Sequence, residues 1–218
     1  MNKYGLNKSV SKAAMASLLV LGMSAADVRA DDDITQSRDL DAFTGIVIEG
    51  AMDITVKVGS NQTVEITTDE DYMDRVETRV ESGDLIIGQK GRRWRNNSLE
   101  VEITVQSLDS FRVEGAADAY IEGISSDNFV VEIEGAADLT LEGQCVKAEY
   151  TINGAGDINS RDFICEDVNI EINGAGDADV YASKKIVATL NGIGDVSVYG
   201  DPNNIRPRIN GLGSFEIK

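Results

Sequence analysis

The chain has 218 residues and no histidine, and its 38 acidic residues outnumber 20 basic ones, giving a net charge of −18. The absence of histidine excludes Ser-His-Asp and Cys-His catalytic systems and histidine-ligated metal sites. The acidic balance argues against a nucleic-acid partner, because phosphate contacts need clustered Lys and Arg. Carboxylate chemistry and a calcium site are left open, and we predict a protein that is not an enzyme.

Residues 1–30 have the pattern of a secretory signal peptide. Basic residues at the start are followed by an apolar stretch at 13–25, and small residues precede a cleavage point before Asp31. The apolar stretch is shorter than the ~20 residues that a membrane-spanning helix needs. We therefore expect an exported protein, periplasmic or at the cell surface, that does not span a membrane once the signal is cleaved. The mature part keeps 16 basic and 37 acidic residues, a net charge of −21.

The mature chain is predicted to hold one domain, over residues 43–218, after an acidic leader at 31–42 that we predict to be disordered. The front of the domain contains short segments with alternating apolar and polar residues, which is typical of strands. These segments are 63–68, 76–80, 85–89 and 99–105. We expect them to form hairpins or wider coils that cap the N-terminal end of the repeats described below, because uncovered strand edges invite aggregation.

A basic cluster interrupts this acidic chain. Four cations surround the only tryptophan: Lys90, Arg92, Arg93 and Arg95 around Trp94. Charge and stacking together could hold an anionic glycan or a phosphate-bearing envelope lipid. The alternative is a solvated loop tip with the tryptophan folded onto its neighbours.

The C-terminal two-thirds repeats a Glu/Asn-Gly-Ala-x-Asp motif, with variations at its third to fifth positions. Its first glycines are separated by 20, 19, 20, 18 and 19 residues; they are Gly115, Gly135, Gly154, Gly174, Gly192 and Gly211. An isolated copy lies upstream at residues 49–53. Apolar and polar residues alternate on both sides of each motif, which is typical of strands. Each unit is therefore predicted to be a strand, a glycine-containing corner and a second strand. Such units cannot bury an apolar face alone, and we predict an all-β solenoid of stacked coils of about twenty residues, ~4.8 Å apart.

Stacking would align equivalent side chains into columns. An asparagine column at 153, 173, 191 and 210 is expected to hydrogen-bond along the stack. An aspartate column consists of Asp118, Asp138, Asp157, Asp177 and Asp195. One interpretation is a row of carboxylates that binds Ca²⁺, a cation that prefers oxygen ligands. The other, which we favour, is that each aspartate accepts hydrogen bonds from the backbone of its own turn.

Cys145 and Cys165, the only cysteines, occupy nearly equivalent points on successive coils. Neighbouring strands bring Cα atoms within disulfide range, and an exported protein meets an oxidising compartment. We predict a disulfide, with two buried free thiols as the alternative.

The repeated corners, with Ile-Asn-Gly at 152–154, 172–174 and 209–211, resemble the family called putative auto-transporter adhesin, head GIN domain. The resemblance extends over residues 43–218. It implies a right-handed β-helix-like fold, an envelope or surface location, and no catalytic residues.

Three functions remain open at this point. The first is a binding or adhesion-type module whose partner is an envelope or surface glycan, lipid or protein. The second is a periplasmic structural or signalling component that acts through protein partners. The third and most remote is a polysaccharide-active enzyme, since repeated carboxylates usually report architecture rather than catalysis.

Overall fold

The structure is a computed structural model that describes residues 33–91 and 98–218. The predicted signal peptide at 1–30 lies outside the described residues. The part from Asp31 onward clusters as one compact unit. The described residues form the following strands and one short helix: β1 (Asp33–Ser37), β2 (Gly45–Glu49), β3 (Ala51–Val58), β4 (Thr63–Asp69), α1 (Glu70–Met73), β5 (Val76–Glu81), β6 (Asp84–Gln89), β7 (Glu100–Val105), β8 (Ser110–Val113), β9 (Ala116–Ile133), β10 (Ala136–Ile152), β11 (Ala155–Ile172), β12 (Ala178–Leu190), β13 (Val196–Tyr199), β14 (Asn204–Ile209) and β15 (Phe215–Ile217).

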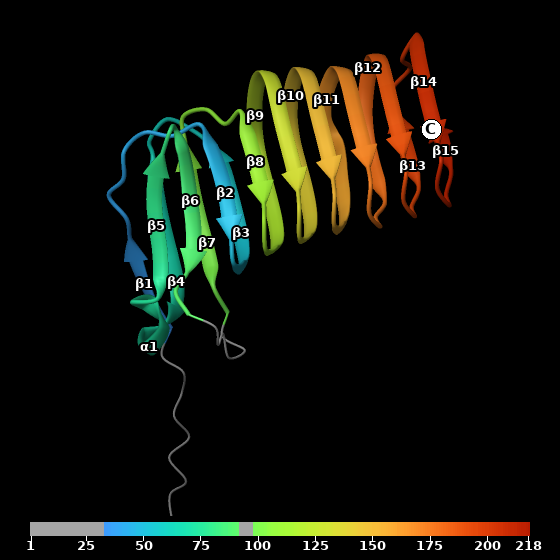
Figure 1. Cartoon of the computed structure of the whole chain (residues 1–218). Helices are drawn as coiled ribbons and strands as arrows, with labels where there is room; N and C mark the ends of the chain where they lie inside the picture. Colours follow the sequence, from blue (N-terminus) through green and yellow to red (C-terminus); the bar gives the residue numbers. More distant parts are fainter. Residues whose placement is uncertain (1–32, 92–97) are drawn as a thin grey trace, which may run out of the picture. The chain divides into compact units, whose positions relative to one another are not determined.

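The predicted β-solenoid is confirmed, with coils stacked side by side (Figure 1). The long strands β9 to β12 each take part in two parallel ladders, one through each half of the strand. The first wall runs β1-β4-β7-β3-β9-β10-β11-β12-β13-β15. The second wall runs β5-β6-β2-β8-β9-β10-β11-β12-β14. Both walls therefore extend from the N-terminal block to the last coil.

The interior is a continuous apolar core made of the alternating positions that the sequence predicted. The residues just before the first five repeated glycine corners are at most 2% exposed; they are Val113, Ile133, Ile152, Ile172 and Leu190. Phe129 and Phe163 meet edge to face inside the stack, with ring centroids 5.3 Å apart. Tyr150 is also buried, and its hydroxyl donates to Ser160 Oγ at 3.2 Å. Burial raises the pKa of Tyr150 well above its ordinary value, so it remains a neutral donor.

The glycine corners stack so closely that no side chain fits between them. A Cβ added at Gly135 would lie 1.8 Å from the carbonyl oxygen of Gly115, and one at Gly154 would lie 1.9 Å from that of Gly135. Real Cβ atoms do not approach backbone so closely, so these positions require glycine for space rather than for a positive φ. The repeated motif therefore marks the line along which coils are in closest contact.

The N-terminal block caps the stack, as predicted. The upstream motif copy forms β2 and β3, which pair in register with β8 and β9 of the first regular coil. The intervening residues extend the two walls away from that coil: β4 and β7 lie beyond β3, while β5 and β6 lie beyond β2.

The prediction of a disordered leader over 31–42 was wrong for residues 33–37, which form β1. This strand pairs antiparallel with β4, for example Ile34 with Thr68 and Gln36 with Ile66. Alternation explains the difference, because Ile34 turns toward the core while the polar residues beside it face outward. The acidic composition of the segment favoured a prediction of disorder, although its alternating residues are compatible with a short edge strand.

The predicted disulfide is confirmed: Cys145 and Cys165 are bonded, with Cα atoms 4.5 Å apart and a sequence separation of 20. They are direct neighbours in the β10–β11 ladder. The bond therefore staples two successive coils.

Candidate functional site

The predicted basic site falls largely outside the described residues. Arg92, Arg93, Trp94 and Arg95 all lie there. Lys90 is described, and its ammonium forms an ion pair with Glu77 on β5. An anionic-ligand site at this cluster stays a prediction.

The aspartate column forms as predicted, but its hydrogen bonds differ from the expectation. Asp157 Oδ1 accepts the backbone N–H of Asp177 at 2.9 Å, and Asp177 Oδ1 accepts that of Asp195 at 2.8 Å. Asp195 Oδ1 accepts the N–H of Ser214 at 2.7 Å. Each donor belongs to the next coil rather than to the same turn. The aspartates thus link coils where the regular strand pairing is interrupted at the corner.

At the other end of the column, Asp118 and Asp138 lie side by side in the β9–β10 ladder, where the backbone pairing is regular. Within residues 33–91 and 98–218, no group of three or more His, Cys, Asp or Glu side chains is arranged to hold a metal ion. The Ca²⁺ interpretation stays a prediction.

The asparagine column is confirmed as a ladder. The amide of Asn173 donates to the side-chain oxygen of Asn153 at 2.9 Å, Asn191 donates to Asn173 at 2.8 Å, and Asn210 donates to Asn191 at 2.9 Å. Each bond ties one corner to the next.

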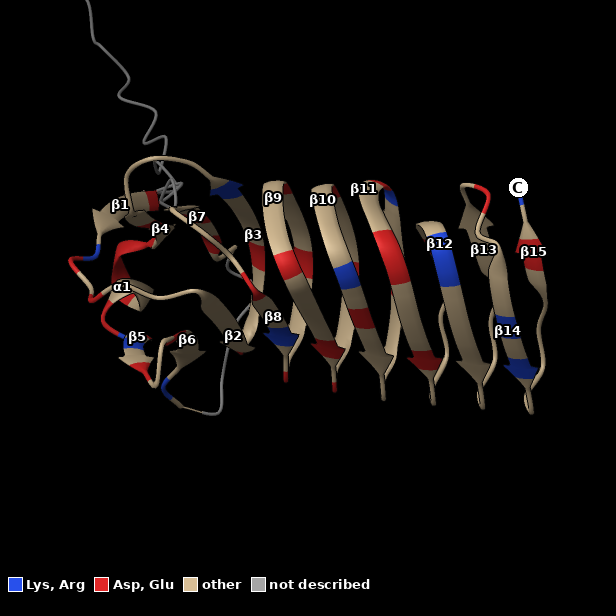
Figure 2. Cartoon of the chain, turned by 90° about the horizontal axis from the view of Figure 1, so that it is seen from above, with Lys and Arg blue, Asp and Glu red and all other residues tan. Residues whose placement is uncertain are grey.

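The outer face of the first wall carries several acidic residues, and Figure 2 shows Asp and Glu positions (red) recurring along the stacked coils. Besides the aspartate column, this face presents Glu122, Glu142 and Asp179, with Lys57 and Arg161 ion-paired to two of them. Tyr120 donates to Glu142 at 2.8 Å. That hydrogen bond, together with desolvation and nearby carboxylates, raises the pKa of Tyr120 to about 12.

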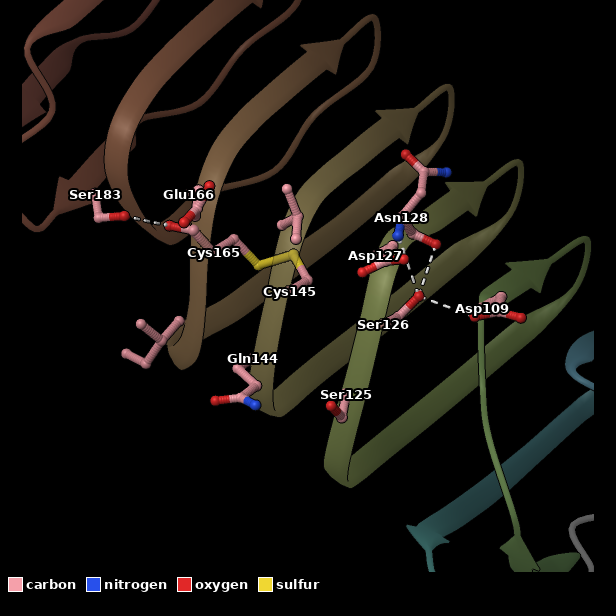
Figure 3. Close-up of a pocket in the computed structure, with 12 residues that line it drawn as sticks. Asp109, Ser125, Ser126, Asp127, Asn128, Gln144, Cys145, Cys165, Glu166 and Ser183 are labelled. Atoms are coloured by element: carbon pink, nitrogen blue, oxygen red, sulfur yellow. Dashed lines mark hydrogen bonds between the residues drawn. A yellow bond between two sulfur atoms is a disulfide. The ribbon is translucent and has the colours of Figure 1, made fainter.

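A groove of about 790 Å³ crosses several coils where the long strands pass from the first wall to the second (Figure 3). The backbone here forms a narrow third side, with Gly143, Gln144 and Cys145 on β10 as its central segment. The groove's lining residues are Asp109, Ser125, Ser126, Asp127, Asn128, Gln144, Cys145, Val146, Ile164, Cys165, Glu166 and Ser183. The disulfide forms part of its floor.

The groove combines polar groups with exposed aliphatic side chains. Val146 and Ile164 are 48% and 44% exposed, in contrast to the buried aliphatic residues beneath them. Ser126 Oγ lies 2.9 Å from both Asp109 Oδ1 and the Asn128 carbonyl oxygen, so these acceptors share one hydroxyl proton. Gln144 supplies an exposed carboxamide. The surface therefore offers hydrogen-bond donors, acceptors and apolar contacts together.

Sequence analysis identified the cysteines but not the groove around them. The columns beside the disulfide vary from coil to coil, with Ser125, Gln144 and Ile164 at equivalent positions. A repeat is recognised from positions that hold the same residue type in each coil, so positions that vary between coils do not stand out. One signal was available: Phe163, Ile164 and Cys165 are three consecutive apolar residues, which breaks the alternation and places one of them on the surface.

Stacked coils define the class of protein as a β-solenoid, and this one carries an open groove of mixed polar and apolar character. The sequence matches the model of the family described as putative auto-transporter adhesin, head GIN domain, over residues 42–202. The chain belongs to this family. No protein of curated function matches it significantly.

Two solved structures share the fold. A putative adhesin from Bacteroides fragilis NCTC 9343 is 19% identical, with a TM-score of 0.72 over 87% of this chain and 98% of the other. A putative lipid binding protein from Parabacteroides distasonis ATCC 8503 is 20% identical, with a TM-score of 0.53 and the same coverage. In the part of the chain that the structure describes, no helix is long and apolar enough to cross a membrane.

Proposed function

We propose that this protein is an exported, non-enzymatic binding module of the bacterial envelope or surface, which holds an extended ligand in the groove beside the disulfide. The observation that carries the proposal is the pair of exposed aliphatic side chains, Val146 and Ile164, set among hydroxyl, carboxamide and carboxylate groups. Apolar side chains that are grouped on a surface and rimmed by polar residues are typical of a site that a partner covers. The family's description as an adhesin head supports this proposal.

The shape of the groove favours a ligand that extends along the stack. Its lining residues come from successive coils, from Asp109 before β8 to Ser183 on β12. Neighbouring coils repeat at ~4.8 Å, so an extended chain can meet a new coil at each step. A polysaccharide fits best, because each sugar ring offers hydroxyl groups for Gln144 and Ser125 and an apolar face for Ile164.

Binding without catalysis agrees with the chemistry of the groove. The chain has no histidine, and the Glu166 carboxylate is ion-paired with Lys184. Asp109 accepts the Ser126 hydroxyl. Carboxylates engaged in this way serve to position neighbouring side chains, whereas a glycosidase must direct two free carboxyl groups at one bond.

Introducing positive charges into the groove should weaken binding. The double substitution Val146→Arg and Ile164→Arg replaces the apolar contacts with bulky cations and should weaken binding by at least about tenfold, or ~1.4 kcal/mol. The measurement is a titration of the purified protein with protein-free envelope polysaccharide and, separately, with envelope protein freed of polysaccharide. The matched control is Asn169→Arg, an exposed position on the second wall.

The proposal fails if the groove variant binds as tightly as the unmodified protein, or if Asn169→Arg reduces binding equally. Binding only to the envelope protein fraction would assign the groove a protein partner. Loss of binding in a variant with Arg92, Arg93, Trp94 and Arg95 changed to alanine, with the groove variant unaffected, would move the site to the basic cluster. That outcome would favour an anionic glycan or lipid headgroup.

A further inference from the structure

The last described coil, formed by β14 and β15, leaves core positions uncovered. Ile205, Ile209 and Ile217 are 44%, 45% and 41% exposed. Their direct neighbours on the preceding coil are Ile186, Leu190 and Val198, which are at most 2% exposed. The paired side chains of the two coils are all aliphatic and face the same way. Those of the last coil are more exposed because nothing in the described structure stacks on it.

This coil also presents unpaired backbone. The N–H of Asn210 donates to the Leu190 carbonyl, and alternate residues of a parallel strand direct their backbone groups to opposite neighbours. The N–H groups of Ile205 and Ile209 on β14 therefore face away from β12. Pro207 lies between them and has no N–H to offer. The outer edge of β14 can therefore donate hydrogen bonds to another strand at Ile205 and Ile209 but not at Pro207.

At the cap, each wall ends in a strand that has one unpaired edge among the described residues. Within the described residues, β1 pairs only with β4, and β5 pairs only with β6. Ile34 on β1 and Val80 on β5 are inward-facing but only partly buried. The first wall thus runs from β1 to β15 and the second from β5 to β14, so a second copy stacked head to tail would continue both walls.

The strand directions suit such stacking. All strands from β7 to β15 along the first wall are parallel, and β4 and then β1 each reverse direction, so β1 is parallel to β15. Along the second wall only β5 is reversed, so β5 would meet β14 antiparallel. Both arrangements allow regular backbone pairing.

The two ends carry opposite charge. Residues 203–218 contain Arg206, Arg208 and Lys218 against Glu216, a net charge of +2. The cap residues 33–42 and 63–89 contain 11 acidic and 3 basic residues, a net charge of −8. Neither Arg206 nor Arg208 forms an ion pair with any described residue. In a chain that is acidic overall, these two arginines form a basic surface that has no acidic partner among the residues that the structure describes.

We propose that the last coil binds the acidic cap of a second copy of this protein, so that copies stack head to tail. The apolar residues of the last coil are covered by the cap, and β15 pairs with β1. The arginines of β14 meet Glu77 and Glu81 on β5, which exchange their partners within the chain, Lys90 and Arg79, for the arginines of the second copy. The contact is heterologous and does not close on itself, so it builds chains of copies rather than a symmetric dimer. Pro207 removes one donor and keeps the contact reversible. Several grooves would then lie along one axis, which raises the avidity for a long ligand.

Sedimentation of the purified protein tests the proposal through charge reversal. The mean mass of the unmodified protein should at least double between about 5 and 500 µM in about 20 mM salt, and fall back toward the monomer in about 500 mM salt. A last-coil variant, Arg206→Glu with Arg208→Glu, should remain monomeric. A cap variant, Glu77→Lys with Glu81→Lys, should also remain monomeric, because both changes bring like charges together.

An equimolar mixture of the two variants should associate again, because each provides an end that complements the other. Circular dichroism and melting temperature check that both variants fold, and exposed ion pairs such as Glu81–Arg79 contribute little to stability. The proposal is overturned if the unmodified protein stays monomeric under all conditions. It is equally overturned if either variant associates as the unmodified protein does, or if the mixture stays monomeric.

Discussion

Replacing Gly154 with alanine should lower the free energy of unfolding by about 4 kcal/mol or more, because the added Cβ collides with fixed backbone. The Cβ would lie 1.9 Å from the carbonyl oxygen of Gly135. Gly135 cannot retreat, since it is itself stacked against Gly115, and Gly174 presses on Gly154 from the other side. The two coils would have to separate and give up corner hydrogen bonds such as that from the Ala155 N–H to the Gly135 carbonyl.

The matched control for this prediction is Gly211→Ala. Its Cβ would meet the carbonyl oxygen of Gly192 at 1.8 Å, the same clash in the last described coil. No described coil stacks on its outer side, so the strand can move outward, and the loss should be less than half as large. Urea unfolding followed by circular dichroism measures both variants. Equal stability of Gly154→Ala and the unmodified protein would show that the corners are not in tight contact.

Removing the disulfide should cost about 3 kcal/mol, the value expected for a cross-link that closes a loop of about twenty residues. The fold itself suggests the replacement residues. Ser126 and Ala182 occupy the positions equivalent to Cys145 and Cys165 on the coils to either side. The double variant Cys145→Ser and Cys165→Ala should therefore fit without a clash or a large cavity and remove only the cross-link.

Urea unfolding with and without a thiol reductant checks this prediction. The reductant should lower the stability of the unmodified protein to that of the double variant, and leave the variant unchanged. The unmodified protein, denatured without reductant, should show no free thiol, because Cys145 and Cys165 are the only cysteines in the chain. A loss below about 1 kcal/mol would mean that the core alone holds the coils together.

Much of the fold followed from the sequence because a solenoid repeats its constraints. The spacing of the glycines fixed the coil length, and the alternating residues around Ile152 and Ile172 identified which side chains face inward. The positions of the two cysteines within the repeat predicted their pairing. Each of these inferences depends on local periodicity, which backbone geometry enforces in every coil.

The features that the sequence missed depend on places where the repeat is irregular or ends. β1 forms because β4 offers a free edge to pair with, although its own composition favours disorder. The aspartates bond the next coil because strand pairing is interrupted at the later corners, and spacing alone does not reveal that interruption. The groove lies on variable positions, where Ile164 and Val146 replace polar residues of other coils.

Hydrogen exchange read by mass spectrometry would show whether the groove beside the disulfide is the ligand site. The purified protein would be compared alone and saturated with protein-free envelope polysaccharide. If the groove holds the ligand, exchange should become slower in the peptides that contain residues 124–128, 143–146 and 163–166, and exchange in the aspartate column should not change. Protection confined to the aspartate column or to residues 90–95, with the groove peptides unchanged, would contradict it.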